Sequence, residues 1–126
     1  MIPAPDDVHR IVYLGTPALA IPPLVALHAA GYEMPLVVSQ PDAKRGRGSE
    51  RSPSPVKQAA LDLGLTVTDR VDDVLDVEAD LAVVVACGQL IRPHVLEHLP
   101  MVNMHVSLLP RWRGAAPVER AILAGD

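Results

Sequence analysis

The chain has 126 residues, the length of a single domain. Hydrophobic residues make up 49% and charged residues 21%, values that exclude a wholly disordered or fibrous protein. Eleven Lys and Arg against 15 Asp and Glu give a net charge of −4, which disfavours a protein that coats nucleic acid through bulk charge. Because only 2% of the residues are aromatic, the core must be aliphatic, as suits a parallel sheet that is buried on both faces.

Cysteine content and hydropathy indicate the compartment. The single Cys87 cannot form an internal disulfide, and the first ten residues do not resemble a signal peptide. The longest apolar run, residues 81–87, is far too short to span a membrane. We therefore expect a soluble, cytoplasmic protein with no membrane partner.

The first half of the chain alternates strand patterns with helix patterns. The apolar spacing predicts, in order, strand 10–15, helix 19–30, strand 34–39 and helix 54–63. Pro22 and Pro23 belong in the first turn of the first helix, since prolines deeper in a helix would break it. The polar segment 40–53 is predicted to be a long loop, and loops of that length are usually functional or disordered.

The second half continues the same alternation. It predicts a weak strand at 65–68, an acidic segment at 69–78, strand 80–86, helix 93–99, strand 102–106, loop 107–114 and a closing helix at 115–124. Strand 80–86 is apolar at every interior position, which indicates a central parallel strand. The order of the elements predicts an α/β fold with a Rossmann-like, doubly wound, mostly parallel sheet in one domain over residues 1–126.

The first turn lacks a phosphate-binding motif. Dinucleotide-binding folds place three glycines after the first strand, whereas this turn has only Gly15, and Pro17 removes an amide donor. A P-loop is absent as well. The turn therefore argues against dinucleotide binding.

The residues best suited to catalysis are Asn103 and His105. Residues two apart in a strand project from the same face, and open α/β sheets bind ligands where strands end. An amide N–H can stabilise an oxyanion while an imidazole moves a proton, as acyl-type transfer requires. The alternative is that both are structural polar residues at a sheet edge.

Three other features point less clearly to catalysis or ligand binding. His94 and His98 have the spacing of metal ligands, but no third ligand is evident, so a solvated helix face is the better interpretation and no metal is expected. Cys87 is interpreted as a small hydrophobic residue. The basic loop contains Lys44, Arg45, Arg47 and Arg51, and it either contacts a phosphate backbone or is merely solvated.

Longer motifs give the sequence a family resemblance. They are Gly15-Thr-Pro, Gln40-Pro-Asp, Gly46-Arg-Gly, Ser54-Pro-Val-Lys57, Val83-Val-Val-Ala-x-Gly88, Asn103-x-His105 and Ser107-Leu-Leu-Pro-Arg-Trp-Arg-Gly-Ala-Ala-Pro117. From about residue 8 to its end, the chain resembles the N-terminal part of methionyl-tRNA formyltransferases. The resemblance implies the formyltransferase variant of the Rossmann-like fold.

The resemblance also implies a reaction, in which a formyl group passes from 10-formyltetrahydrofolate to the amino group of methionyl initiator tRNA. Asn103 would bind the formyl oxygen, and His105 would add electrostatic support and help to move a proton to the departing folate nitrogen. The residues implied in folate binding are Ser107, Leu108, Leu109, Pro110, Gln89, Leu90 and Ile91. Those implied in tRNA binding are Lys44, Arg45 and Arg47.

The chain departs from the family pattern in two places and at its end. Cys87 stands where the family usually has tyrosine, and Leu19 where it has phenylalanine. The family's catalytic aspartate, the last strands of the sheet and the C-terminal barrel domain would follow Asp126, so the domain is expected to be incomplete. We accordingly expect weak or no formyl transfer by this chain alone, and self-association through an exposed sheet edge.

Two alternatives remain open at the level of sequence. The first is a formyltransferase that acts on an amino sugar or another small amine, which would not need the basic loop for RNA. The second is a non-catalytic remnant that binds folate or a partner, which would show folate binding without transfer.

Overall fold

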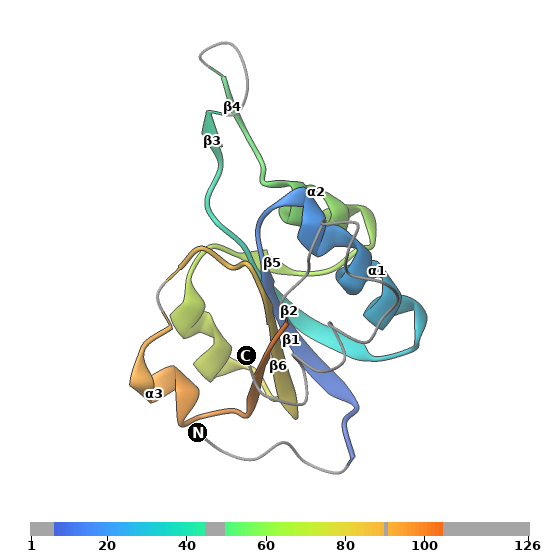
Figure 1. Ribbon diagram of the computed structural model, residues 1–126, viewed down its shortest axis with the longest axis vertical. Coiled ribbons are helices and arrows are strands. Elements are labelled where there is room, and N and C mark those ends of the chain that lie inside the picture. Colours follow the sequence, from blue (N-terminus) through green and yellow to red (C-terminus); the bar gives the residue numbers. More distant parts are fainter. Residues whose placement is uncertain (1–6, 45–49, 90, 105–126) are drawn as a thin grey trace, which may run out of the picture.

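The computed structural model describes residues 7–44, 50–89 and 91–104. Its centre is a sheet of five parallel strands in the order β5-β2-β1-β6-β7 (Figure 1). The strands are β1 (Arg10–Gly15), β2 (Glu33–Val38), β5 (Val67–Thr68), β6 (Leu81–Val85) and β7 (Met101–Asn103). The α/β class and the parallel sheet predicted from the sequence are confirmed.

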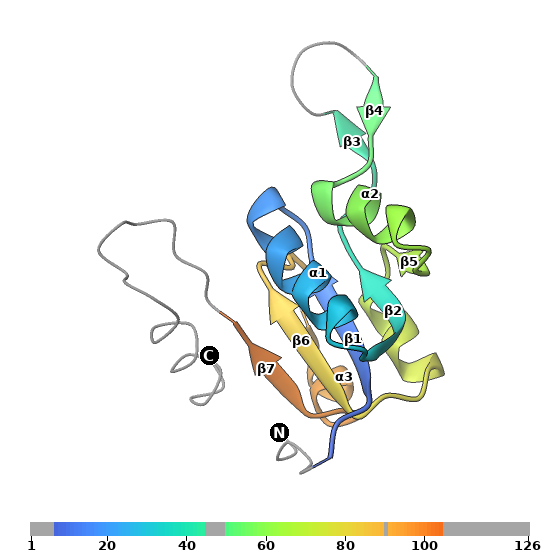
Figure 2. The ribbon, with the colours of Figure 1, turned by 90° about the vertical axis from the view of Figure 1, so that its right-hand side faces the viewer.

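Helices cover both faces of this sheet. The helical elements are η1 (Ala18–Ala20), α1 (Ile21–Ala29), α2 (Pro55–Asp62), η2 (Val71–Asp76) and α3 (Pro93–Leu96), of which η1 and η2 are 3-10 helices. Figures 1 and 2 show α1 and α2 on one face, and η2 and α3 on the other. The sheet is therefore doubly wound, with a core on each face.

The central strand β1 supplies both cores. Ile11 and Tyr13 pack into the core under α1 and α2, whereas Val12 and Leu14 pack into the core under η2 and α3. All four are at most 2% exposed, which explains why this strand is a continuous apolar run. The Tyr13 hydroxyl donates a hydrogen bond of 2.5 Å to the carbonyl oxygen of Ala20, and burial raises the pKa of this phenol.

Strand β2 contains an irregularity that its sequence explains. Arg10 pairs with Glu33 but Val12 pairs with Leu36, so β2 has one extra residue over this interval. Pro35 lies within it and cannot donate to the ladder, as is common at a bulge. The extra residue places Met34 and Val37 in the same core despite their odd spacing.

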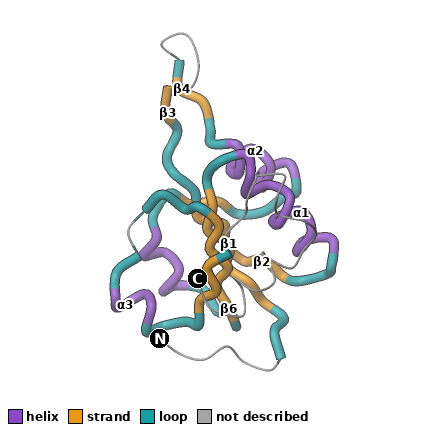
Figure 3. The backbone as a smooth tube through the Cα atoms, viewed as in Figure 1, coloured by secondary structure: helices purple, strands orange, loops and turns teal. Residues whose placement is uncertain are grey.

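Segment 40–53 is not a loop throughout. It contains the strands β3 (Ala43–Lys44) and β4 (Arg51–Ser52), which pair antiparallel and form an arm that projects from the body (Figures 1 and 3). The residues between these strands, 45–49, lie outside the described residues. We call β3 and β4 the arm.

Other boundaries shift in ways that have physical causes. The acidic segment 69–78 contains η2. Its Val71 and Val74 are three residues apart, and both are buried in the core under η2 and α3. Helix α1 begins at Ile21 after the 3-10 turn η1, with Pro22 and Pro23 in its first turn as predicted. The first described strand residue of β7 is Met101, and the predicted strand 102–106, loop 107–114 and helix 115–124 lie partly or wholly outside the described residues.

The edges of the sheet are β5 and β7 among the described strands. Self-association through the strand of Asn103 stays a prediction. In the part of the chain that the structure covers, no helix has the length and apolarity needed to cross a membrane.

Candidate functional site

The candidate site lies at the carboxyl ends of the parallel strands. The chain leaves β1 over the face of α1, but it passes from β6 to β7 over the opposite face, that of α3 (Figure 2). The winding direction therefore switches between β1 and β6, and open α/β sheets bind ligands at the carboxyl edge beside such a switch. The segments that follow β1, β2 and β6 meet here.

Thr16 joins these segments. Its Oγ1 donates a hydrogen bond of 2.6 Å to the Cys87 carbonyl oxygen after β6, and it accepts one of 3.2 Å from the Gln40 amide after β2. The preceding Gly15 allows this closeness, since a Cβ there would lie 2.9 Å from the Val85 carbonyl oxygen. A side chain at residue 15 would therefore force the ends of β1 and β6 apart.

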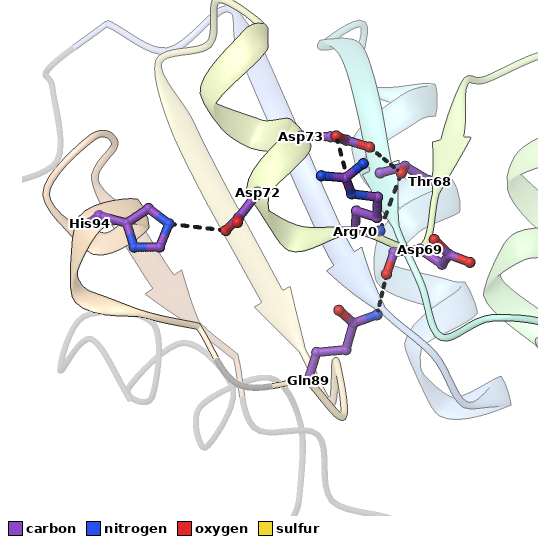
Figure 4. A network of polar contacts seen from close by, with 7 residues as sticks. All are labelled: Thr68, Asp69, Arg70, Asp72, Asp73, Gln89 and His94. Carbon is purple, nitrogen blue, oxygen red and sulfur yellow. Dashed lines mark hydrogen bonds and ion pairs between the residues drawn. The ribbon is translucent and has the colours of Figure 1, made fainter.

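The loop after β6 has an unusual backbone. Ala86 adopts a φ of 51°, a left-handed conformation that costs energy for a residue with a Cβ, and Gly88 has a φ of 82°. Gln40 Nε2 donates a hydrogen bond of 2.5 Å to the Gly88 carbonyl oxygen. Figure 4 shows the second contact, in which Gln89 Nε2 donates a hydrogen bond of 2.9 Å to the Asp69 carbonyl oxygen. The loop is thus tied to the segment after β2 by Gln40 and to the segment after β5 by its own Gln89.

Cys87 lies under this loop and is only 3% exposed. Burial raises the pKa of its thiol, which stays protonated near neutral pH. Its position agrees with the interpretation as a small hydrophobic residue.

Asn103 is the last residue of β7 and is exposed at the carboxyl edge. It pairs with Val84 of β6, and the Met104 amide donates 2.8 Å to the Val84 carbonyl oxygen, which continues the ladder. This position is the one predicted for a group that meets a substrate. His105 lies outside the described residues, so its juxtaposition with Asn103 stays a prediction.

The implied folate-binding residues are only partly covered. Gln89 is half-buried in the loop after β6, whereas Ile91 packs against the core under η2 and α3. Ser107, Leu108, Leu109, Pro110 and Leu90 lie outside the described residues. A pterin-lined cleft formed with them stays a prediction.

The arm carries the described part of the basic loop. Lys44 is exposed on β3 and pairs in register with Arg51 on β4, so two cations stand side by side. At the base of the arm, Lys57 Nζ lies 2.7 Å from Asp42 Oδ1, and Arg51 Nη1 donates 3.3 Å to the Asp42 carbonyl oxygen. Arg45 and Arg47 lie outside the described residues.

A pocket of about 240 Å³ opens between the ends of β2 and β5. We call it the β2–β5 pocket. It is lined by Ser39, Gln40, Pro41, Lys57, Val67, Thr68 and Asp69.

One residue of the histidine pair, His94, is engaged with an acidic side chain. His94 Nε2 lies 3.0 Å from Asp72 Oδ1, which ties α3 to η2 (Figure 4). Within residues 7–44, 50–89 and 91–104, no three His, Cys, Asp or Glu side chains are placed to hold a metal ion.

Sequence reasoning assigned no role to Thr16, Gln40, Asp69 or Ala86. Thr16 and Gln40 stand in short motifs beside proline, which was a usable signal. No sequence signal indicated the left-handed backbone of Ala86 or the position of Asp69, because both depend on contacts between segments that are distant in the sequence.

Residues 9–126 match the family described as formyl transferase. The relatives that carry the name methionyl-tRNA formyltransferase include proteins from three different organisms. The protein from Heliobacterium modesticaldum is 46% identical, that from Synechococcus sp. strain CC9902 48%, and that from Neisseria meningitidis strain FAM18 46%. Each match covers 93% of this chain but only 40%, 38% and 42% of the respective relative, so the chain spans about two fifths of their length.

Proposed function

The chain belongs to the formyl transferase family, and from that membership we propose that it is the N-terminal catalytic part of a methionyl-tRNA formyltransferase. The observation that carries this proposal is the identity of 46% to 48% over 93% of the chain to proteins of that name. The reactants would be methionyl initiator tRNA and 10-formyltetrahydrofolate. We place the reaction in the cytoplasm.

The described residues fit a reduced folate at the carboxyl edge. A pterin is recognised by amides and backbone groups, and the loop after β6 offers both in a shape fixed by Gln40 and Gln89. The folate supplies the formyl group. Gln89, Leu90 and Ile91 would line one side of its site, and residues 107–110 the other.

Asn103 would act on the formyl oxygen. As the methionine amino group forms its bond to the formyl carbon, negative charge develops on that oxygen, and the exposed amide N–H of Asn103 would donate a hydrogen bond to it. The bond from the formyl carbon to the folate nitrogen then breaks. His105 would take the proton that the amine loses and give it to that nitrogen, so that atoms and charge balance.

Lys44, Arg45 and Arg47 would bind the acceptor end of the tRNA. Lys44 and Arg51 already place two positive charges together on a part of the chain that projects from an otherwise acidic protein. Such a cluster suits a phosphate backbone better than a small neutral substrate.

The direct test is formyl transfer by the protein at the length that its gene encodes. We expect formyl-methionyl-tRNA to form from 10-formyltetrahydrofolate, and the Arg45→Ala/Arg47→Ala variant to lower kcat/KM for tRNA without changing folate affinity. Transfer only to a free amino sugar or small amine, with no effect of these arginines, would identify the first alternative instead. Folate binding without any transfer would identify the second.

A further inference from the structure

The segment that follows β5 is firmly held in place. We call residues 68–73 the platform. The Thr68 hydroxyl accepts a hydrogen bond of 3.2 Å from the Arg70 amide and donates one to the Asp73 carboxylate, so side chains brace the turn between these residues (Figure 4). Val71 of the same segment is buried in the core under η2 and α3. The platform is therefore held by its own hydrogen bonds and by packing against the sheet.

Two contacts join the loop after β6 and the start of α3 to this platform. Gln89 Nε2 donates a hydrogen bond of 2.9 Å to the Asp69 carbonyl oxygen. Beyond the loop, His94 Nε2 of α3 lies 3.0 Å from Asp72 Oδ1. Figure 4 shows both side chains reaching the platform from separate points of the chain. The loop is therefore tied to the platform within its own length and again just after it.

The contact with Asp69 determines where the Gln89 side chain points. Its amide group is turned toward the platform, and a pterin that took this amide as a ligand would compete with the Asp69 carbonyl oxygen (Figure 4). The backbone of the loop is different, because Ala86 and Gly88 have left-handed conformations that give it a specific shape. A ligand that contacts this backbone binds more tightly if the shape exists beforehand, since ordering a loop on binding costs free energy.

We propose that Gln89 and His94 are positioning residues, which hold the loop after β6 on the platform in the conformation that receives the folate. Their effect on folate rests on the proposed function. Gln89 would lie beside the folate, and its side chain would bond to the protein rather than to the pterin. Asp72 would influence folate affinity through His94 alone.

Both contacts can be lost without loss of the fold. Ile91 lies between them in the chain and packs against the core that contains Val74 and Val95, so this part of the molecule keeps its packing. The side chains of His94 and Asp72 are 49% and 56% exposed, and exposed pairs contribute little to stability. Substitutions at these positions should therefore change the conformation of the loop more than the melting temperature.

The test uses the protein at the length that its gene encodes, with tetrahydrofolate as the ligand. In Gln89→Met, which keeps the length of the side chain but not its donor, we expect the affinity to fall about two- to tenfold, the usual effect of one neutral hydrogen bond. In His94→Ala we expect a fall of about two- to fivefold. The backbone amide resonance of Gly88 should move in both variants before the ligand is added. The KM for 10-formyltetrahydrofolate should rise by the same factors, while kcat and the KM for tRNA stay unchanged.

Further variants separate positioning from a general loss of structure. Combining Asp72→Ala with His94→Ala should cause no further loss of affinity, because the two side chains act as one pair. His94→Gln keeps an N–H donor and should retain most of the affinity. Asp7→Ala is the matched control, because it removes another exposed pair, in which His9 Nε2 lies 3.0 Å from Asp7 Oδ2 ahead of β1. This control should bind tetrahydrofolate as the unchanged protein does.

Unchanged folate affinity in both Gln89→Met and His94→Ala would overturn the positioning role. A loss in Gln89→Met that leaves the Gly88 resonance of the ligand-free protein in place would also overturn it, because Gln89 would then be a direct ligand. Transfer to tRNA with one KM for folate in all variants would remove only the positioning role. A Gly88 resonance that moves in a protein without folate binding or formyl transfer would remove the proposed function and leave the attachment of the loop to the platform standing.

Discussion

The two ends of the parallel strands use polar residues in opposite ways. At the amino edge, Asp80 Oδ2 accepts from the His9 and Arg10 amides, and Arg10 in turn reaches Glu33 Oε2 at 2.6 Å and the Glu78 carbonyl oxygen at 2.8 Å. At the carboxyl edge, the Asp69 carboxylate and the Asn103 amide have no such partners among the described residues. The polar groups of one edge complete the fold, whereas these two side chains at the other edge have no hydrogen-bond partner among the described residues.

The two edges also differ in their pockets. The larger pocket, about 390 Å³, lies at the amino edge and is lined in part by Arg10, Glu78 and Asp80. These groups are already engaged with one another or with the backbone, so a ligand there would compete with the contacts that hold β1 and β6 together. The β2–β5 pocket at the carboxyl edge is smaller, about 240 Å³, and the carboxylate of its lining residue Asp69 has no partner within the described residues.

Removing the Asn103 amide should have the largest effect. In the protein at the length that its gene encodes, we expect Asn103→Ala to lower kcat for formyl transfer about 100- to 1,000-fold, the usual loss for one oxyanion donor. Because the side chain is exposed, the melting temperature should stay within about a degree of the unchanged protein. Single-turnover assays and calorimetry measure the two quantities.

The matched control for Asn103→Ala is Gln58→Ala, which removes an exposed amide from α2. Its kcat should equal that of the unchanged protein. Equal losses of kcat in both variants, or full activity in Asn103→Ala, would contradict a specific role for the Asn103 amide at the carboxyl edge.

Gly15 gives the next largest effect, this time on stability. Gly15→Ala places a Cβ 2.9 Å from the Val85 carbonyl oxygen and 3.1 Å from Ala20 Cβ, so overpacking should lower the free energy of unfolding by about 1 to 3 kcal/mol. Urea unfolding measures the change.

Gly31→Ala is the comparison variant for Gly15→Ala, because a Cβ at residue 31 meets nothing within 4 Å and only its φ of 95° opposes the change. Comparing the two variants therefore separates the cost of close packing at residue 15 from the cost of backbone strain at residue 31. Adding Val85→Ala should leave the Gly15→Ala loss unchanged, since the clash is with the backbone oxygen. Unfolding of Gly15→Ala at the same urea concentration as the unchanged chain would show that the strand ends yield freely.

Thr16→Val tests whether the carboxyl edge is held together by hydrogen bonds. The change keeps the shape but leaves the Cys87 carbonyl oxygen and the Gln40 amide without their partner, which should cost about 1 to 2 kcal/mol of unfolding free energy. Thr16→Ser retains the hydroxyl and should restore most of it. Affinity for a reduced folate, measured by calorimetry, should fall in Thr16→Val only; equal affinities would exclude a role for this contact in shaping the site.

Much of the fold could be predicted because burial leaves a direct pattern. Strands β1 and β6 are buried on both faces and appear as unbroken apolar runs. Helix α2 begins at Pro55 and is capped by Ser54, whose Oγ accepts a hydrogen bond from the Lys57 amide. The element η2 was missed, because Val71 and Val74 stand among acidic residues and only tertiary contacts reveal that they are buried. The bulge in β2 likewise depends on its register with β1.

The candidate site could be predicted less fully. Asn103 was located from the end of an apolar segment, and its exposed position at the carboxyl edge agrees with that prediction. The bond from Thr16 to Cys87 spans 71 residues, and no local pattern encodes it. No local pattern identifies the Asp69 carboxylate either, because its hydrogen-bond partners depend on residues that are distant in the sequence.

The smallest effect is expected at the amino edge, where it depends on pH. The backbone N–H groups of His9 and Arg10 hold the pKa of the Asp80 carboxyl below its ordinary value of about 3.9. A depressed pKa in the folded state stabilises the protein above the unfolded pKa, and this stabilisation is lost as pH falls through the folded value.

Asp80→Asn keeps an acceptor oxygen but loses the charge, so its melting temperature should be a few degrees lower at pH 7. That difference should shrink as the pH falls below about 4, as thermal scans at decreasing pH would show. Formyl transfer at pH 7 should be unchanged, because Asp80 lies at the end of the sheet away from Asn103; a loss of transfer with unaltered stability would mean that the amino edge also serves the reaction.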